Sequence, residues 1–380
     1  MAYFDNNATT PLGKNALLVY QSALANDWSN PSSPYRSASR VRAKLECARE
    51  ELAFALGVNQ EGLIFTSGAT EANNSVFAHA ASNGKKGGRC ILSPFEHPSI
   101  IEPAKFWFKD RLTFMPADAS GRVDLGETEQ LLNTENISLV SLMAANNETG
   151  VIQPWHELAK LCLEKGIFFH CDATQWIGKL DSSLFSICTS FSASAHKFSG
   201  PKGLGCLVSN EPIQLLLGGQ QEKGNRGGTE NYPAIASMLA ALKDANIELE
   251  EFSKRVEWRD HFEQNIINTI PGTIVLGKES PRLWNTSMIL LPKFDYLSWV
   301  GKLDKRGISV STGSACSVGN VLNSSLVSSM RLSSNEAGRL VRISSYSDQN
   351  ESDWQSLDIA FSHVFKELKD DASRSSVISL

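Results

Sequence analysis

Cysteine pairs are missing from this sequence of 380 residues. Its seven cysteines are odd in number and scattered, and none belongs to a Cys-x-x-Cys motif. They are Cys47, Cys90, Cys162, Cys171, Cys188, Cys206 and Cys316. This spacing argues against a disulfide framework and against a zinc site, so we expect a cytoplasmic protein without a bound metal. It leaves the question of what a single unpaired cysteine would do.

Long apolar runs and an excess of positive charge are missing as well. A membrane-spanning helix needs about 18 consecutive apolar residues, and no apolar run of this sequence approaches that length. The first residues, MAYFDNN, lack the basic and apolar parts of a secretory signal. The sequence has 36 Lys and Arg residues and 41 Asp and Glu residues, which gives a net charge of -5. We therefore expect no membrane association and no direct nucleic-acid binding.

The first 230 residues alternate between short apolar runs and helical patterns. The predicted strands are 63–66, 90–93, 139–145, 167–171, 187–192 and 204–208. The predicted helices beside them are 40–56, 70–81, 157–164 and 234–252. Alternating strands and helices indicate an α/β fold with a mainly parallel sheet, whose ligand crevice lies beyond the carboxyl ends of the strands.

From about residue 246 the pattern changes to shorter strands between amphipathic helices. The predicted elements are a helix at 248–267, strands at 273–276, 286–291, 308–311 and 340–344, and a helix at 352–368. The Ser-rich tail from residue 369 is expected to fray. We therefore expect a large domain over residues 16–250, and a smaller α+β domain formed by 1–15 and 251–380.

Two strand ends carry polar motifs with more than one interpretation. Residues 66–71 read TSGATE, and a helix start with small residues and the Thr70 hydroxyl suits an anion. An ordinary turn with a Thr cap fits equally well. Asp172 ends a buried strand, where a carboxylate needs a protonated partner such as the ring nitrogen of pyridoxal phosphate. A helix N-cap is the alternative for Asp172.

A lysine and a cysteine are the candidate reactive groups. Lys197 follows a strand within SASAHKFSGPKG, where partial desolvation would suit Schiff-base chemistry; the alternative is a surface lysine, a role that Lys202 fills more naturally. Ser194 and His196 could donate to a phosphate. Cys316 is the one cysteine in a loop rich in Ser and Gly, so it is the nucleophile candidate, although an incidental loop cysteine would look the same.

Two further polar residues, His97 and Arg342, are candidates for the site because of their positions relative to predicted strands. His97 follows a predicted strand, and its imidazole could stack on a flat cofactor or move protons. Arg342 lies in an apolar strand, where its charge needs a partner. A substrate carboxylate would serve, and a structural ion pair is the common alternative.

Together these motifs resemble the cysteine desulfurases of the NifS/IscS type, within the class V aminotransferase group of pyridoxal-phosphate enzymes of fold type I. The resemblance runs from Phe4 to Arg342. The matching segments are 4–11 (FDNNATTP), 66–71 (TSGATE), 96–97 (EH), 146–150 (NNETG), 172–175 (DATQ), 196–197 (HK), 200–203 (GPKG), 226–231 (RGGTEN) and 313–316 (GSAC).

The resemblance implies pyridoxal 5′-phosphate as the cofactor and a role for each matching residue. Lys197 would hold the cofactor covalently, Asp172 would pair with the ring nitrogen, Gln175 with the ring hydroxyl, and His97 would stack on the ring. The phosphate would be bound by Ala69, Thr70, Ser194, His196 and, from the neighbouring subunit of a homodimer, Thr229. Asn147 would contact cofactor and substrate, and Arg342 would hold the substrate carboxylate.

The resemblance also implies the reaction. L-cysteine would be converted to L-alanine, with Lys197, His97 and Cys316 as catalytic residues and the sulfur held on Cys316 as a persulfide. A sulfur-acceptor or scaffold protein, as in iron–sulfur cluster assembly, would be the partner. A class V aminotransferase, a selenocysteine or other carbon–sulfur lyase and a non-catalytic paralogue are the alternatives. The motif GSAC argues against most of these alternative enzymes, because they would not need a loop cysteine. The presence of Lys197 and Asp172 argues against the non-catalytic paralogue.

Overall fold

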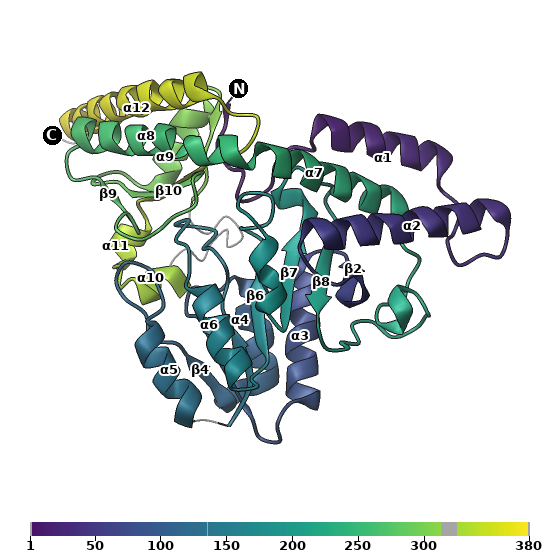
Figure 1. The fold of residues 1–380 in the computed structure, drawn as a ribbon. Helices are drawn as coiled ribbons and strands as arrows, with labels where there is room; N and C mark the ends of the chain where they lie inside the picture. The colour runs from purple at the N-terminus through teal and green to yellow at the C-terminus, as the bar shows by residue number, and fades with distance from the viewer. Residues whose placement is uncertain (1, 135, 313–324, 379–380) are drawn as a thin grey trace.

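A seven-stranded sheet in the order β2-β8-β7-β6-β5-β3-β4 lies at the centre of the larger part of the protein (Figure 1). The computed structural model describes residues 2–134, 136–312 and 325–378. The strands are β2 (Leu63–Thr66), β3 (Arg89–Leu92), β4 (Leu112–Phe114), β5 (Ile137–Ser141), β6 (Phe169–Asp172), β7 (Ser190–Ser194) and β8 (Gly205–Ser209). β8 runs antiparallel to both neighbours and the other pairs are parallel, which confirms the predicted mainly parallel sheet.

Helices cover both faces of this sheet. They are α1 (Lys14–Asn26), α2 (Arg36–Ala55), α3 (Ala69–Asn83), α4 (Pro98–Phe108), α5 (Leu125–Thr134), α6 (Trp155–Glu164) and α7 (Tyr232–Lys254). Side chains alternate between the two faces, as the period of a strand requires. Ile91 and Val140 belong to the cluster under α2, α6 and α7, whereas Leu92 and Leu139 belong to the cluster under α3 and α4.

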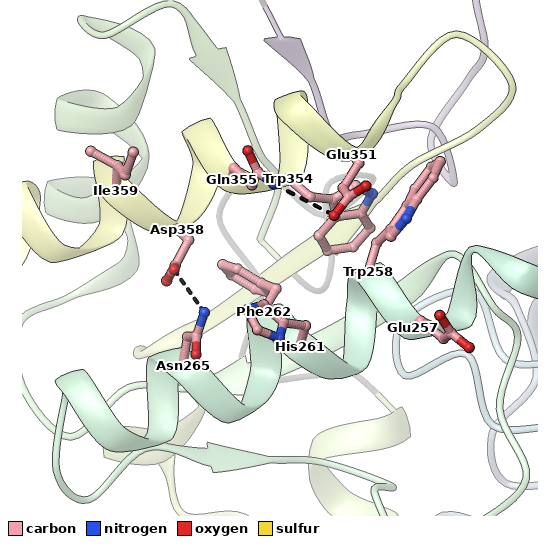
Figure 2. A pocket seen from close by; sticks show the side chains of 10 residues that line it. All are labelled: Glu257, Trp258, His261, Phe262, Asn265, Glu351, Trp354, Gln355, Asp358 and Ile359. Atoms are coloured by element: carbon pink, nitrogen blue, oxygen red, sulfur yellow. Dashed lines mark hydrogen bonds between the residues drawn. The ribbon is translucent and has the colours of Figure 1, made fainter.

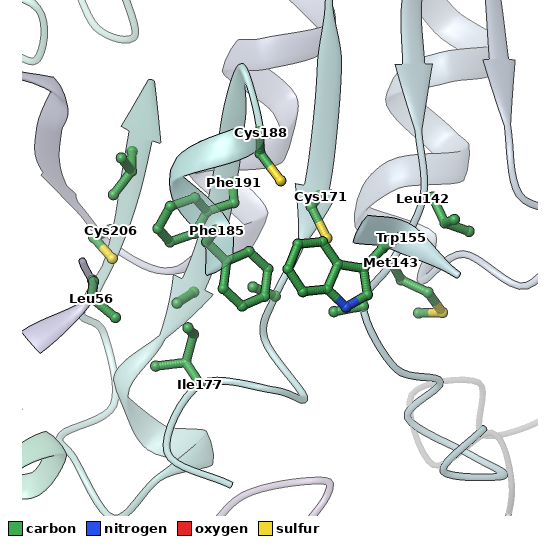
Figure 3. Packing of buried hydrophobic residues seen from close by; sticks show 14 of the residues in the cluster. Leu56, Leu142, Met143, Trp155, Cys171, Ile177, Phe185, Cys188, Phe191 and Cys206 are labelled. Atoms are coloured by element: carbon green, nitrogen blue, oxygen red, sulfur yellow. The ribbon is translucent and has the colours of Figure 1, made fainter. Parts of the chain in front are cut away.

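Aromatic rings and cysteines fill the first of these clusters (Figure 3). The rings of Trp155 and Phe185 stack with their centroids 4.2 Å apart. Burial raises the pKa of the Cys162 and Cys206 thiols to about 12, so these thiols stay protonated at neutral pH. Cys90, Cys171 and Cys188 are buried too, as expected for cysteines that serve packing, whereas Cys47 is exposed.

The smaller part contains two small sheets and the C-terminal helices. β9 (Ile274–Val275), β10 (Thr286–Leu290) and β12 (Leu340–Ser344) form an antiparallel sheet, and β1 (Ala2–Tyr3) pairs with β11 (Ile308–Ser309). The helices are α8 (Val256–Thr269), α9 (Tyr296–Asp304), α10 (Ser325–Ser329), α11 (Ser334–Ala337) and α12 (Glu351–Ile378). A separate hydrophobic cluster joins Phe4 to Trp299 and Phe361, so the N-terminus packs with the C-terminal part. Across the described residues, no helix combines the length and the hydropathy of a membrane span.

Short 3-10 turns precede or follow several strands: η1 (Gln60–Gly62), η2 (Lys109–Arg111), η3 (Ser183–Ile187), η4 (Ala195–Lys197) and η5 (Glu222–Gly224). They explain one difference from the predicted elements, because η3 occupies the start of the segment expected to be a strand, and β7 begins only at Ser190. The single helix expected over 248–267 is divided, since α7 ends at Lys254 and α8 begins at Val256.

The C-terminal tail is helical, which corrects the prediction that it frays. α12 continues to Ile378. Lys369 places its ammonium 4.2 Å from the ring centre of Phe365, and Asp371 forms a 2.8 Å ion pair with Lys302 of α9. These contacts stabilise the end of α12, and the Ser-rich composition of the tail does not reveal them.

A histidine inside the central sheet gives the fold a pH-dependent stability. His170 lies in β6 with Nδ1 2.8 Å from Ser190 Oγ and Nε2 3.0 Å from Asn73 Oδ1. Burial lowers the pKa of His170 to about 4, so the folded protein keeps the ring neutral. The unfolded chain takes up a proton below about pH 6.5. The stability linked to this ring is therefore complete above about pH 6.5 and is lost as the pH falls towards about 4.

We predict that His170→Gln, which takes up no proton, weakens this pH dependence. Between about pH 7.5 and about pH 5.5 the free energy of unfolding of the wild type should fall by about 1.4 kcal/mol more than that of the variant. Urea denaturation at the two pH values measures the difference, with the exposed His363→Gln as the control. Equal slopes for the wild type and His170→Gln would contradict the prediction.

Candidate active site

Lys197 lies just beyond the carboxyl end of β7, against the N-terminal segment. Its Nζ donates to the carbonyl oxygens of Asn7 at 2.6 Å and Ala8 at 2.7 Å. The adjacent carbonyl of His196 accepts from both the backbone N–H and the hydroxyl of Thr10. The lysine turn is therefore fixed to residues that precede the whole central sheet in the sequence.

Asp172 lies at the carboxyl end of the neighbouring strand, β6, and is 5 % exposed. Its Oδ1 accepts from the backbone N–H of Thr174 at 3.0 Å, and its Oδ2 accepts from Asn73 Nδ2 at 3.0 Å. The first bond is the local turn bond that a capping carboxylate makes. The second bond comes from α3, so the carboxylate is also held by the layer that covers the sheet.

The turn into α3 packs closely against β8 and leaves backbone N–H groups without an acceptor. Gly68 has a φ of +149°, and a Cβ on Gly205 would lie only 2.7 Å from the Cα of Gly68. The backbone N–H of Ala69 donates to Ser194 Oγ at 2.8 Å. Among the described residues, the backbone N–H groups of Thr70 and Glu71 in the first turn have no hydrogen-bond acceptor. Unpaired N–H groups at a helix start attract an anion such as a phosphate.

Gln175 is held by a lysine that the sequence analysis did not single out. Lys179 is 1 % exposed, and its Nζ donates to Gln175 Oε1 at 2.5 Å and to Asn7 Oδ1 at 2.9 Å. The Nε2 of Gln175 donates to the carbonyl of Asn7 at 3.1 Å. The amide of Gln175 therefore has its oxygen on Lys179 and its NH2 group on the side of Asn7.

Arg342 comes from β12 of the small sheet and reaches the same region. It forms a 2.7 Å ion pair with Asp5, and its Nη1 donates to the carbonyl of Asn147 at 3.1 Å. The structural ion pair that the sequence left open as an alternative is thus present. The Nε–H of Arg342 is buried and has no partner among the described residues, so this guanidinium keeps one donor for a ligand.

The charges of these groups act on one another. Burial lowers the pKa of His97; the positive charge of Lys197 adds to this lowering, while the carboxylate of Asp172 opposes it. Burial also lowers the pKa of Lys179 well below its usual value, and the charges of Lys197 and Arg342 lower it further. Residues from β6, η4, α4 and β12 therefore share one electrostatic environment.

Two further titratable groups border the site. Glu96 is buried and accepts at Oε1 from the backbone N–H of Met143. Its burial, with the nearby charge of Asp172, raises the pKa of its carboxyl well above the usual range. Burial and the charge of Lys197 lower the pKa of His196 to about 4, so its ring is neutral at neutral pH.

The structure does not bring every predicted site residue together. Thr229 is exposed in the loop before α7, which the 2.9 Å ion pair of Arg226 with Glu71 ties to the start of α3. Within the described part of the chain Thr229 has no hydrogen bond to the other site residues. Cys316 lies outside the described residues.

Sequence reasoning missed Asn7, Asn73 and Lys179 as members of the site. Asn7 lies in the segment FDNNATTP, which the resemblance included without giving it a role. Lys179 stands between apolar residues, Ile177 and Leu180, and a charge in such a place is a signal that was available. Asn73 gave no signal, because its partner Asp172 is 99 residues away in the sequence.

A separate pocket of about 550 Å³ lies between α8 and α12 (Figure 2). Trp258, Phe262 and Trp354 give it aromatic walls, and Asp358 accepts there from Asn265 at 3.0 Å. Neither Lys197 nor Asp172 contributes to it. The chemistry suggested by the strand ends is therefore not associated with this pocket.

Comparison with known proteins agrees with this geometry. The family model for class V aminotransferases matches residues 2–357. The chain is 35% identical over 361 residues to a cysteine desulfurase of Enterobacter agglomerans, a match that covers 93% of this chain and 90% of the relative.

Solved structures with a similar fold support the same family. A structure described as a NifS-like protein superposes with a TM-score of 0.88 at 32% identity, covering 96% of this chain and 99% of that one. A structure described as SspA in complex with cysteine superposes with a TM-score of 0.76 at 28% identity, covering 90% of this chain and 98% of that one. The chain therefore belongs to the class V aminotransferase family, among its cysteine desulfurases.

Proposed function

We propose that this protein uses pyridoxal 5′-phosphate to convert L-cysteine to L-alanine and receives the sulfur on Cys316 as a persulfide. The observation that carries the proposal is the position of Lys197 and Asp172 at the carboxyl ends of two adjacent parallel strands, where the charges of both act on His97. A lysine and a carboxylate in this relation suit the aldehyde and the ring nitrogen of the cofactor. The printed names of the relatives, including the structure with bound cysteine, support the choice of substrate.

The described residues fit the cofactor. The free N–H groups at the start of α3 and the Ser194 hydroxyl suit its phosphate, with Thr70 and His196 beside them. Gln175 offers its NH2 group to the ring hydroxyl, because its oxygen is taken by Lys179. When bound, the cofactor supplies an electron sink for the negative charge left at the substrate Cα.

Each residue of the site then has its own role in the reaction. Arg342, with Asn147 beside it, holds the substrate carboxylate, and Lys197 Nζ takes the proton from the substrate Cα. The Cys316 thiolate attacks the substrate sulfur, so that an S–S bond forms and the C–S bond breaks. The electron pair of the broken bond stays with the substrate Cβ, which takes up a proton. Lys197 Nζ returns its proton to the Cα, and the product leaves as L-alanine. The persulfide then passes to a sulfur-acceptor or scaffold protein.

A homodimer with two domains per subunit is part of the proposal. Exposed apolar side chains on α1, α2 and the loop between them support a subunit interface there: Leu17, Leu18, Leu24, Trp28, Tyr35 and Phe54. Thr229 is exposed, which leaves it available to the phosphate of a neighbouring subunit. The separate hydrophobic cluster of Phe4 and residues 262–368 supports a small domain of 1–15 and 251–380 beside a large domain of 16–250.

Cys316→Ser should keep the visible absorbance of the bound cofactor but release no sulfide when a reductant is present, because a hydroxyl is a poor nucleophile towards sulfur. Sulfide and alanine assays after addition of L-cysteine measure this, and mass spectrometry locates the persulfide. Cys47→Ser, at an exposed cysteine on α2, is the control and should behave as the wild type. Alanine release without a persulfide on Cys316 would instead favour a carbon–sulfur lyase.

Lys197→Ala should abolish the covalent link between protein and cofactor, because no other amine is proposed to hold it. Borohydride reduction followed by peptide mass spectrometry should find the cofactor on Lys197 in the wild type and on no lysine in the variant. Lys202→Ala is the matched control, since it changes an exposed lysine of the same loop. A cofactor fixed equally well to the Lys197 variant would overturn the assignment.

Arg342→Lys should raise the KM for L-cysteine by about 10- to 150-fold, because the substrate carboxylate loses a charge-assisted, planar pair of donors. Steady-state kinetics at saturating cofactor measures the change. The control is Arg306→Lys, at a surface ion pair with Glu367. An unchanged KM in the Arg342 variant would show that the guanidinium serves only its bonds to Asp5 and to the carbonyl of Asn147.

A further inference from the structure

The ring of His97 is held at one nitrogen by two groups of Ser99. His97 caps the start of α4, and its Nδ1 accepts from the backbone N–H of Ser99 at 3.1 Å. The same Nδ1 lies 2.8 Å from the hydroxyl oxygen of Ser99. A backbone N–H only donates, so the Nδ1 that faces it carries no proton.

The hydroxyl proton of Ser99 is directed to the same nitrogen by Asn73. Asn73 is fully buried, and its Nδ2 donates to Ser99 Oγ at 2.9 Å and to Asp172 Oδ2 at 3.0 Å. Because Ser99 Oγ accepts from this amide, its own proton is left for His97 Nδ1.

The amide of Asn73 has only one acceptable orientation. Its Oδ1 accepts from Ser192 Oγ at 2.6 Å and lies 3.0 Å from His170 Nε2. Turning the amide over would set its oxygen against the carboxylate oxygen of Asp172, where both atoms are acceptors. The carboxylate therefore orients Asn73, Asn73 orients Ser99, and Ser99 decides which nitrogen of His97 carries the proton.

We propose that Asn73 and Ser99 are positioning residues that keep the neutral ring of His97 protonated at Nε2, so that His97 serves the reaction as a hydrogen-bond donor and not as its base. A ring with Nδ1 engaged and Nε2 protonated has no lone pair free to receive a proton from the substrate thiol. It stabilises negative charge on a neighbouring atom by donating from Nε2. This assignment rests on the proposed function, which places His97 against the cofactor.

The charges around His97 agree with a neutral ring. Asp172 from β6 and Lys197 from η4 act on it in opposite directions, and its neighbour Glu96 is a buried carboxyl whose pKa is raised. Burial is the largest effect and lowers the pKa of His97. A protonated ring would in addition turn an Nδ1–H against the N–H of Ser99, which opposes protonation further.

Nitrogen NMR of the full-length chain with labelled histidine tests the proposal. The chain has seven histidines, and His97→Gln identifies the resonances of His97. We expect a protonated Nε2 and an unprotonated Nδ1 at neutral pH, both with and without pyridoxal phosphate. In Ser99→Ala, which loses one of the two donors to Nδ1, the pKa of His97 should rise by about half to one pH unit.

Ser298→Ala is the matched control. Ser298 also lies in the first turn of a helix, α9, and bonds to its N-cap side chain, Asp295, away from the site. It should leave the pKa of His97 unchanged. A proton found on Nδ1, or an unchanged pKa of His97 in Ser99→Ala, would overturn the proposal; if that variant does not fold, the proton position in the wild type decides alone. Sulfide assays on the same samples test the desulfurase function separately, so the two failures are distinguishable.

Discussion

One buried asparagine holds together the segments that form the site. Asn7 is 1% exposed and hydrogen-bonds to residues of the small sheet and of the segments that follow β5, β6 and β7 of the large sheet. Its partners are Asn147, Gln175, Lys179, Lys197, Asn285, Thr286 and Ser344. Each buried polar group left without a partner would cost about 1–3 kcal/mol, so the N-terminal segment cannot move without disturbing many of these bonds at once. The position of the lysine thus depends on residues at the very start of the chain.

Charged groups of both signs meet where these segments come together. The charges of Lys197 and Arg342 act on Lys179, and Arg342 pairs with Asp5. The carboxylate of Asp172 and the ammonium of Lys197 both act on His97. The phosphate of the proposed cofactor and the carboxylate of an amino acid are both anions, and N–H groups without an acceptor suit such ligands. The Nε–H of Arg342 and the first backbone N–H groups of α3 are such donors, because no residue in the described part of the chain accepts from them.

Rules about strands predicted much of this arrangement from the sequence. The ranges 63–66 and 340–344 coincide with β2 and β12, and the positions of Asp172 and Lys197 at strand ends follow from the rule that ligands bind there. Asn73 and Lys179 were not predictable in this way. The role of each depends on a partner that is distant in the sequence, Asp172 for Asn73 and Asn7 for Lys179. Hydrophobic periodicity carries no information about such partners.

Lys179 shows how far a buried polar residue determines its surroundings. A charged ammonium has three N–H donors, whereas the two bonds that Lys179 makes, to Gln175 and Asn7, account for both N–H donors of an uncharged amine. Burial and the nearby charges of Lys197 and Arg342 favour that uncharged form, since they lower its pKa. A neutral amine still donates to Gln175 Oε1 and so keeps the NH2 group of that amide turned towards the site. The orientation of Gln175 therefore needs no additional positive charge beside Lys197.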